Sequence, residues 1–323
     1  MQIYRSLTEL PSNLGPAVAT IGNFDGVHCG HRWVIAEVIA RARARNLRSL
    51  AITFDPHPVR VLHPEVALKL ITPLQQRLDL LASTGLDTAI VLPFTYDLSL
   101  LSARQFASGI LRDTLQVVEV HEGDNFRFGH DAQAGADTLE QLGRELGFAV
   151  SIYPPRSLRG MPISSSRIRS LISEGNLSAT RALLGRSFSV HSTPASGRGY
   201  GTKYAVPTIN LAAYPELLPA HGVYATLLRI ENEVFEGVSN IGNRPTFGAD
   251  SFAVETHLLN FHPIALTEQT PLELTFLHRL RGEKKWPTPE ALREQITRDV
   301  KKAKRLFDLT RAVLPPLQPG SAE

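Results

Sequence analysis

The first half of the chain alternates short apolar, β-branched runs with longer segments of helical periodicity. The apolar runs predict strands over residues 17–21, 48–54, 88–92, 117–121 and 148–153. The segments between them predict helices over residues 32–45, 73–83, 103–115 and 136–146. In the first of these helices, Val34, Val38 and Ala42 recur every four residues and form an apolar face. This alternation predicts an α/β fold of the Rossmann-like kind, with a parallel sheet covered by helices.

The pattern changes after Gly185. Apolar strands over 223–230 and 234–241 follow one another across a short polar turn, without a helix between them, which predicts an antiparallel β-barrel. A terminal amphipathic helix is predicted over 289–310, with Thr288 as its cap. We therefore expect a first domain over 1–185, a second domain over 186–312 and a flexible tail over 313–323, with the boundary between Gly185 and Ser192.

Composition supports two ordinary globular domains. The 323 residues are 43% hydrophobic and 20% charged, which excludes disordered and collagen-like classes. A net charge of +3 is too small to indicate a nucleic-acid partner, and no apolar run is long enough to predict a membrane span. The N-terminus lacks a signal-peptide pattern, and the single cysteine, Cys29, excludes an internal disulfide. We expect a cytoplasmic protein with small-molecule substrates, and a transient homo-oligomer stays open.

One strand-to-helix junction carries polar chemistry. Segment 19–31 reads ATIGNFDGVHCGH, in which an apolar strand runs through Gly22 into a helix that starts near Gly30. Backbone amides at a helix start have no partner within the helix and can bind anions. His28 and His31 lie three residues apart, so both imidazoles can face one side and donate to phosphate oxygens. The junction predicts a phosphate-binding site.

Two other interpretations of this junction stay open. His28, Cys29 and His31 could form a metal clip, although three ligands within four residues and no second cysteine make a poor tetrahedral zinc site. The histidines could instead be structural, as helix caps or gap fillers. The glycine turn and the presence of a second histidine favour phosphate binding.

A second polar segment, 163–169 (ISSSRIR), follows the fifth predicted strand and opens another helical pattern. Hydroxyls at a helix start can cap free amides and hold phosphate, and Arg169 adds a positive fork. Alone, the segment is typical of a serine-capped helix with a solvated arginine. Together with the histidine junction it predicts the other half of a nucleotide clamp.

Four motifs occur in the order GNFDGVHCGH (22–31), FDPHP (54–58), GDNFRFG (123–129) and ISSSRIR (163–169). In this order they resemble the adenylyltransferase half of the bacterial bifunctional riboflavin kinase/FAD synthetase family, over almost all of the first 185 residues. The resemblance implies a nucleotidyltransferase domain that transfers AMP from ATP to the phosphate of FMN, giving FAD and pyrophosphate. Since the attacking phosphate is already an anion, catalysis needs positioning and charge stabilisation rather than a strong base.

The resemblance also implies roles for individual residues. His28 and His31 would act on the ATP phosphates as catalytic residues, while Ser165, Ser166 and Arg169 would hold the β and γ phosphates. Further nucleotide-binding residues implied by the motifs are Gly22, Asn23, Phe24, Asp25 and Gly30, of which Asn23 and Asp25 would shape the turn. The implied flavin-binding residues are Asn125, Phe54 and Pro56, with the nucleotide left open as a partner of Asn125.

The predicted barrel holds a second candidate site. Thr208 and Asn210 lie two residues apart in extended chain, so their side-chain oxygens point to one side and can help to complete an octahedral Mg²⁺ shell. Glu255 lies on the same strand face as His257 and, opposite a metal-bound nucleotide, could accept a proton from a substrate hydroxyl. Without that context, Pro-Thr-x-Asn is a common loop sequence and Glu255 is a solvated surface carboxylate.

These residues, with GVYATLLRI from position 222 and GVSNIGNRPTFG from position 237, resemble the riboflavin kinase domain of the same family over residues 186–310. The resemblance implies that Thr208 and Asn210 hold Mg²⁺ and ATP, and that Glu255 activates the 5′-hydroxyl of riboflavin. It implies nucleotide contacts from Gly201 and Lys203. The whole chain would then convert riboflavin to FMN, and FMN to FAD, with ATP as co-substrate.

The barrel motif departs from the family pattern. Thr202 stands in place of an arginine, Ala205 in place of a glycine, and the Asp-Leu-Tyr-Gly segment after the glutamate strand is absent. Lys203 offers a point charge without the bidentate fork of arginine. Two alternatives therefore stay open: an FMN adenylyltransferase whose barrel only binds flavin, and a non-catalytic flavin-binding regulatory protein.

Overall fold

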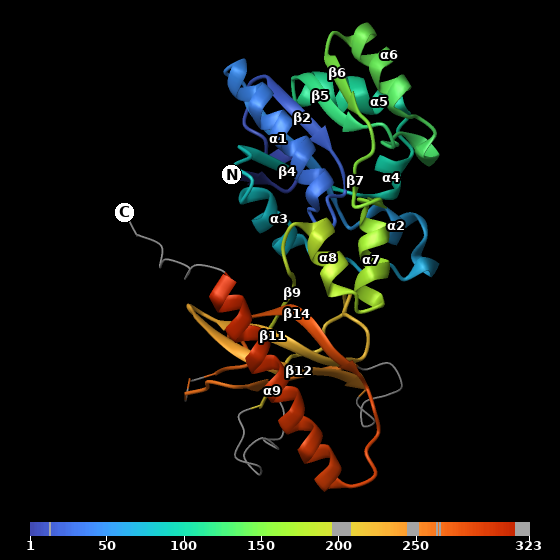
Figure 1. Ribbon diagram of the computed structural model, residues 1–323. Coiled ribbons are helices and arrows are strands. Elements are labelled where there is room, and N and C mark those ends of the chain that lie inside the picture. Colours follow the sequence, from blue (N-terminus) through green and yellow to red (C-terminus); the bar gives the residue numbers. More distant parts are fainter. Residues whose placement is uncertain (13, 196–207, 244–251, 263, 265, 314–323) are drawn as a thin grey trace. The chain divides into compact units, whose positions relative to one another are not determined.

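Figure 1 presents the computed structural model of the chain, which describes residues 1–12, 14–195, 208–243, 252–262, 264 and 266–313. The chain forms two compact units. The first comprises Met1–Ile168 and Leu183–Gly185, and the second comprises Arg169–Ala182 and the residues from 186 onward. The helical residues 169–182 thus group with the second unit. The expected division of the chain at residue 185 stays a prediction.

A six-stranded sheet forms the centre of the first unit, in the order β1-β4-β3-β2-β5-β6. All of its pairings are parallel. The strands are β1 (Gln2–Tyr4), β2 (Ala17–Ile21), β3 (Arg48–Asp55), β4 (Thr88–Pro93), β5 (Val117–Gly123) and β6 (Ala149–Tyr153). The chain adds strands to one side of β2 and then to the other, so β2 and β5 form the switch point where open α/β sheets bind ligands.

Helices cover both faces of this sheet (Figure 1). On one face α1 (Cys29–Ala44) and α3 (Leu74–Ala82) pack with Val18 of β2. On the other face the π-helix η3 (Phe106–Thr114) and α6 (Ala136–Leu146) pack with Ala19 of the same strand. Neighbouring strand residues point to opposite faces, which is why successive residues of β2 enter two different cores.

Shorter elements complete the first unit and the passage to the second. They are η1 (Leu7–Glu9), α2 (Pro58–Leu62), η2 (Pro64–Val66), α4 (Tyr96–Ser99), α5 (Ala103–Gln105), η4 (His130–Ala132), β7 (Ser157–Leu158), β8 (Met161–Pro162), α7 (Ser165–Ser173) and α8 (Leu177–Leu184).

The predicted strands and helices of this half are present, which confirms the Rossmann-like α/β fold. Two details differ. The helix predicted over 103–115 consists of α5 and the π-helix η3, in which the Leu115 amide donates to the Ile110 carbonyl at 2.9 Å, a spacing of five residues. Strand β1 was not predicted, because three residues are too few to show an alternating pattern.

The second unit is built on a six-stranded antiparallel sheet in the order β10-β13-β12-β11-β14-β9. The strands are β9 (Phe188–Ser192), β10 (Thr208–Asn210), β11 (Gly222–Ile230), β12 (Glu233–Asn243), β13 (Phe252–Leu258) and β14 (Leu272–Gly282). A bridge between Pro194 and Leu211 joins the two outer strands, so the sheet curls back on itself as a barrel.

The terminal helix α9 (Pro289–Val313) packs Ala303 and Phe307 against Ala225 of the barrel. The predicted antiparallel barrel with a terminal helix is therefore confirmed. Among the helices that the structure describes, none combines the length and the apolar character needed to cross a membrane.

Candidate active sites

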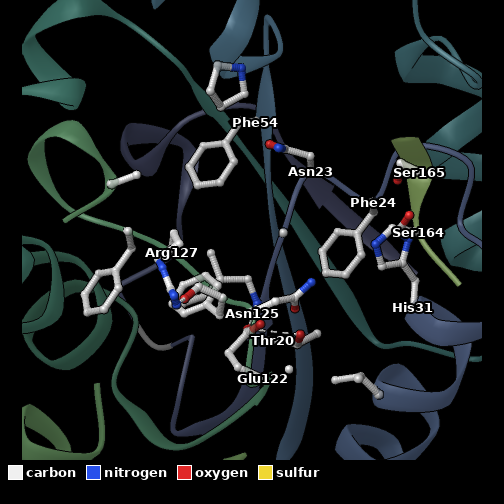
Figure 2. A pocket seen from close by; sticks show the side chains of 18 of the residues that line it. Thr20, Asn23, Phe24, His31, Phe54, Glu122, Asn125, Arg127, Ser164 and Ser165 are labelled. Atoms are coloured by element: carbon white, nitrogen blue, oxygen red, sulfur yellow. Dashed lines mark hydrogen bonds between the residues drawn. The ribbon is translucent and has the colours of Figure 1, made fainter. Parts of the chain in front are cut away.

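A cavity of about 540 Å³ opens in the first unit at the carboxyl ends of the central strands. Residues that follow β2, β3, β4, β5 and β6 line it, together with the first residues of α1 and α7. The pairing of β2 with β5 ends at Ala19 and Val120, although both strands continue beyond that point. The two strands therefore part at the switch point, where Thr20 of β2 and Glu122 of β5 line the cavity (Figure 2).

The histidine junction forms one wall of this cavity. His28 is the N-cap of α1, and its Nδ1 accepts the His31 amide at 3.2 Å. The two imidazole rings stack with their centroids 3.6 Å apart, and Phe24 meets His31 edge-on. A Cβ at Gly30 would lie 3.2 Å from the His28 ring, so glycine leaves room for this stack. Because Nδ1 of His28 is already an acceptor, its neutral form carries the proton on Nε2.

The charge state of this histidine pair differs from that of two imidazolium cations. Burial, and then the neighbouring His28, lower the pKa of His31 well below its usual range. Nδ1 of His31 is also buried without a hydrogen-bond partner among the described residues. His31 is therefore neutral at pH 7, and its ring offers a hydrogen bond rather than a fixed positive charge.

A buried carboxylate holds the turn before α1. Asp25 accepts the amides of Thr72 and Ile71 at 2.9 and 3.1 Å, and the Gly26 amide donates to the Thr72 hydroxyl at 2.8 Å. Gly26 has a φ of +86°, a conformation that residues with a Cβ rarely adopt. This geometry supports the expectation that Asp25 shapes the turn, since both of its oxygens are turned toward the protein rather than toward a ligand.

Arg77 ties the turn after β2 to the end of β3. Its side chain is buried and donates to the carbonyls of Asn23 and Phe54 at 2.7 and 2.9 Å. Burial lowers the pKa of Arg77, against the raising effect of Asp25 and Asp55. The sequence did not point to Arg77, because a single arginine in an amphipathic helix is typical of the solvent-exposed face.

The three serines of segment 163–169 have different environments. Ser164 accepts the Arg167 amide at 3.2 Å and so caps α7, while the Ser165 hydroxyl donates to the Asp25 carbonyl at 2.8 Å. Both serines line the cavity, whereas Ser166 is exposed and does not. Arg169 falls in the second compact unit. The structure therefore places Ser165 at the histidine wall, and it shows that Ser164, which was not predicted, also lines the cavity. Ser166, which was expected to hold phosphate, does not line the cavity.

Aromatic side chains dominate the part of the cavity near β3, β4 and the 123–129 loop. The predicted flavin-binding residues Phe54 and Asn125 line it, with Gly22, Asn23 and Phe24, but Pro56 does not. Sequence reasoning missed three further aromatic residues that line it, Phe94, Phe126 and Phe128. The Phe126 and Phe128 rings stack at 5.2 Å, and Phe94 meets Phe54 edge-on at 5.7 Å. The phenylalanines of the motif GDNFRFG were the available signal.

Another part of the lining combines a cation with aromatic rings. The Arg156 guanidinium lies 3.9 Å from the centroid of the Trp33 ring, and Tyr153 meets that ring edge-on at 4.6 Å. All three residues line the cavity. They come from α1 and from the chain at and after β6, and no motif pointed to them.

The floor of the cavity contains a glutamate that sequence reasoning also missed. Glu122 is 5% exposed, and its Oε1 accepts the Ile21 amide and, at 3.2 Å, the Thr20 hydroxyl. Burial raises the pKa of Glu122 to about 8, although the bonds from Ile21 and Thr20 lower it. The only signal in the sequence was a charged residue at the end of an apolar strand.

The register of the barrel brings the second set of predicted residues together. Asn210 pairs directly with Glu255, and Thr208 pairs with His257, across β10 and β13. Direct partners in an antiparallel pair point to the same face, so Thr208, Asn210 and Glu255 share one face. Oδ1 of Asn210 is buried and accepts no hydrogen bond from the described residues. Gly201 and Lys203 lie outside the described residues.

These features define a class of protein: a nucleotidyltransferase-like α/β unit followed by an antiparallel barrel that carries an oxygen-rich strand face. Comparisons with known proteins agree with this class. The family model for FAD synthetase matches residues 10–167, and the model for riboflavin kinase matches residues 184–307.

Curated relatives resemble the chain along its whole length. The bifunctional riboflavin kinase/FMN adenylyltransferase of Pseudomonas fluorescens is 33% identical over 95% of this chain and 98% of its own length. The protein of the same name from Escherichia coli (strain K12) is 31% identical over 91% of this chain and 94% of its own length. The chain belongs to the family of bifunctional riboflavin kinase/FMN adenylyltransferases. The predicted family and its two enzymatic domains are confirmed.

A solved structure shares the fold. The crystal structure entitled macrolide-efflux protein from Streptococcus pneumoniae superposes with a TM-score of 0.84 at 24% identity, over 94% of this chain and 98% of that chain. At this level of identity the likeness concerns the fold alone.

Proposed function

We propose that the cavity of the first unit binds ATP and FMN together and joins them into FAD. An oxygen of the FMN phosphate attacks the α-phosphorus of ATP, the bond from that phosphorus to the bridging oxygen breaks, and pyrophosphate leaves. The observation that carries this proposal is the convergence of two helix N-termini, those of α1 and α7, on one aromatic-lined cavity. Helix N-termini attract phosphate through their free amides and dipole.

The nucleophile and the leaving group decide what the residues must do. The FMN phosphate is ionised at neutral pH and needs no general base, so the site has to orient the two substrates and stabilise the added charge. Hydrogen bonds from the imidazoles of His28 and His31 would serve the α-phosphate and the departing pyrophosphate. Burial lowers the pKa of His31, and a bound polyphosphate would raise it again because it favours the imidazolium form.

The serines and the aromatic residues would divide the remaining contacts. Ser165 already donates its hydroxyl proton to the Asp25 carbonyl, so the first amides of α7 are the better phosphate donors in this arrangement. We assign the flavin to the part of the cavity that Phe54, Asn125 and the paired phenylalanines line, since a planar tricyclic ring stacks well on aromatic side chains.

We assign riboflavin phosphorylation to the face of β10 and β13. Glu255 would take the proton from the riboflavin 5′-hydroxyl, because an alcohol, unlike the FMN phosphate, needs a base before it attacks a phosphorus atom. Asn210 stands directly opposite Glu255 in the strand register. The base would thereby act on riboflavin directly beside the oxygens that hold the ATP phosphates.

The residues on this face also fit a magnesium ion. Magnesium prefers oxygen ligands, and the buried Oδ1 of Asn210 has no hydrogen bond to give up among the described residues. Thr208, on the same face, supplies a second oxygen. A bound Mg²⁺ would neutralise charge on the ATP phosphates, while Thr208 and Asn210 orient those phosphates toward Glu255.

The metal assignment is tested by titrating Mg²⁺ against FMN formation from riboflavin and ATP. Asn210→Ala should raise the Mg²⁺ concentration needed for half-maximal rate by about 10-fold or more, because it removes one oxygen ligand. Asn232→Ala, in the exposed turn between β11 and β12, is the matched control. An unchanged Mg²⁺ requirement in Asn210→Ala would remove Asn210 from the metal site.

A further inference from the structure

The side chain of Glu122 fills the crevice where β2 and β5 part. These strands stop pairing at Ala19 and Val120, whereas β5 stays paired with β6 as far as Gly123. Beyond this point the Ile21 amide has no backbone carbonyl of β5 to bond, and Oε1 of Glu122 accepts it instead. The carboxyl group therefore continues the β2–β5 ladder with one of its oxygens.

The second carboxyl oxygen has a different environment. Glu122 lines the cavity (Figure 2), and Oε2 has no hydrogen-bond partner among the described residues. No charged side chain is among the groups that shift the pKa of Glu122, and burial, the largest cause, raises it. A carboxylate here would be an uncompensated charge below a site for two anionic substrates. The carboxyl group therefore stays protonated near neutral pH, with Oε2–H as a donor.

We propose that Glu122 is a substrate-binding residue whose Oε2–H donates to a ring nitrogen or carbonyl oxygen at the edge of a nitrogen heterocycle. The proposal rests on the function proposed for this cavity. The phosphates have their own donors at the starts of α1 and α7, so a neutral donor on the floor between the strands suits the uncharged ring of a substrate. The adenine of ATP and the isoalloxazine of FMN both carry such acceptors in the ring plane.

Two substitutions separate this role from the structural one. Glu122→Gln keeps the oxygen that accepts the Ile21 amide and replaces Oε2–H by an N–H donor that cannot ionise. Glu122→Leu has a similar volume and removes both groups. Glu119→Gln is the control, since Glu119 lies on the same strand, is 4% exposed, and is bound by Arg41 and Arg45 outside the cavity.

The measured quantities are the two KM values, for ATP and for FMN, in FAD formation from FMN. This reaction reports on the first unit even though the barrel also binds nucleotide and flavin. Glu122→Leu should raise one of the two KM values by about 10-fold or more and the other by much less, which identifies adenine or isoalloxazine as the ring. Glu122→Gln and Glu119→Gln should both stay within about 3-fold of the unaltered protein at neutral pH.

A pH series gives a readout that a purely structural glutamate would not move. Between about pH 7 and pH 9 the same KM should rise roughly 10-fold in the unaltered protein, as the donor ionises, and stay nearly constant in Glu122→Gln. The other titratable or charged residues that line the cavity are His28, His31, Arg127, Asp131, Tyr153 and Arg156. These are shared by both proteins, so the difference between the two pH profiles belongs to Glu122.

The possible results distinguish failure of the proposed function from failure of the inference about Glu122. If the unaltered protein forms no FAD from FMN and ATP, the proposed function fails first. If it forms FAD but its KM values follow the same pH profile as those of Glu122→Gln, the inference is wrong and the function stands. Equal increases of both KM values in Glu122→Leu would also overturn the inference. If Glu122→Leu does not fold, the pH profiles of the unaltered protein and of Glu122→Gln still test the inference.

Discussion

The two sites of this chain are built on different kinds of sheet. In the first unit, the parallel strands bring residues from five strand ends, and the starts of two helices, to one cavity. In the second unit, the antiparallel strands β10 and β13 present Asn210 and Glu255 as direct partners on one face. A site at strand ends gathers residues that are far apart in sequence, whereas a site on a strand face depends on which residues the register sets opposite each other.

The difference extends to electrostatics. The first site contains buried titratable groups with displaced pKa values, lowered for His31 and raised for Glu122, both mainly by burial. Glu255, the base proposed for the second site, is instead exposed. The proposed chemistry matches this difference: charge stabilisation by buried hydrogen-bond donors in the first site, and proton transfer on an open face in the second.

The largest expected effect belongs to Glu255, the proposed base. Glu255→Gln should lower FMN formation from riboflavin by about 1000-fold, because the amide cannot accept the hydroxyl proton. FAD formation from supplied FMN should remain, since that site lies in the other unit. Glu268→Gln, in an exposed turn, is the control. FMN formation at an undiminished rate would show that Glu255 is not the base.

The corresponding change in the first site should be somewhat smaller. His31→Ala should lower FAD formation from FMN by about 100-fold or more, because it removes a donor that stabilises charge in the transition state. FMN formation from riboflavin should be retained. His63→Ala, at an exposed position outside the cavity, should behave like the unaltered protein. Normal FAD synthesis in His31→Ala would contradict the assignment of the histidine wall.

A stability measurement probes how firmly the strand-end site is anchored. Arg77→Ala should lower the free energy of unfolding by about 3 kcal/mol, because the carbonyls of Asn23 and Phe54 lose buried charge-assisted donors. Urea unfolding of the full chain, followed by circular dichroism and by FAD-forming activity, measures the change. The exposed Arg144→Ala is the control. A loss no larger than that of the control would mean that Arg77 does not anchor the turn.

The smallest effect concerns the pH dependence of stability. The pKa of Glu122 is about 8 in the folded protein, above its usual value of 4.5. Its contribution to stability is therefore complete below the unfolded-state pKa and is lost as pH rises toward 8. Over 1.5 pH units within this window the loss amounts to about 2 kcal/mol. Glu122→Gln should lack this loss, so its unfolding midpoint should fall less than that of the unaltered protein between about pH 6 and pH 7.5.

Sequence reasoning recovered what local patterns encode. Strand β2 and the histidine junction were predictable, because an apolar run, a glycine turn and a helix start are adjacent in the chain. Glu122 was not, since its role depends on where β2 and β5 stop pairing, a contact between residues about 100 positions apart. The same holds for Asn210 and Glu255: each was selected singly, but only the register shows that they face each other.

Side-chain contacts caused the remaining differences. Three consecutive serines look alike in the sequence, yet Ser164 caps the helix, Ser165 bonds to the Asp25 carbonyl and Ser166 is exposed. Pro56 was selected with its motif, but it does not line the cavity that Phe54 and Pro58 line. A motif identifies a segment, whereas the direction of each side chain depends on the packing around it.

We propose that one chain carries two complementary sites, one at the strand ends and one on the strand face. The test is to incubate the protein with riboflavin, ATP and Mg²⁺ and to separate riboflavin, FMN and FAD by chromatography. We expect FMN to appear first and then to be converted to FAD. If riboflavin stays unchanged while supplied FMN becomes FAD, the barrel face is not a kinase site. If supplied FMN also stays unchanged, the assignment of the first cavity is contradicted as well.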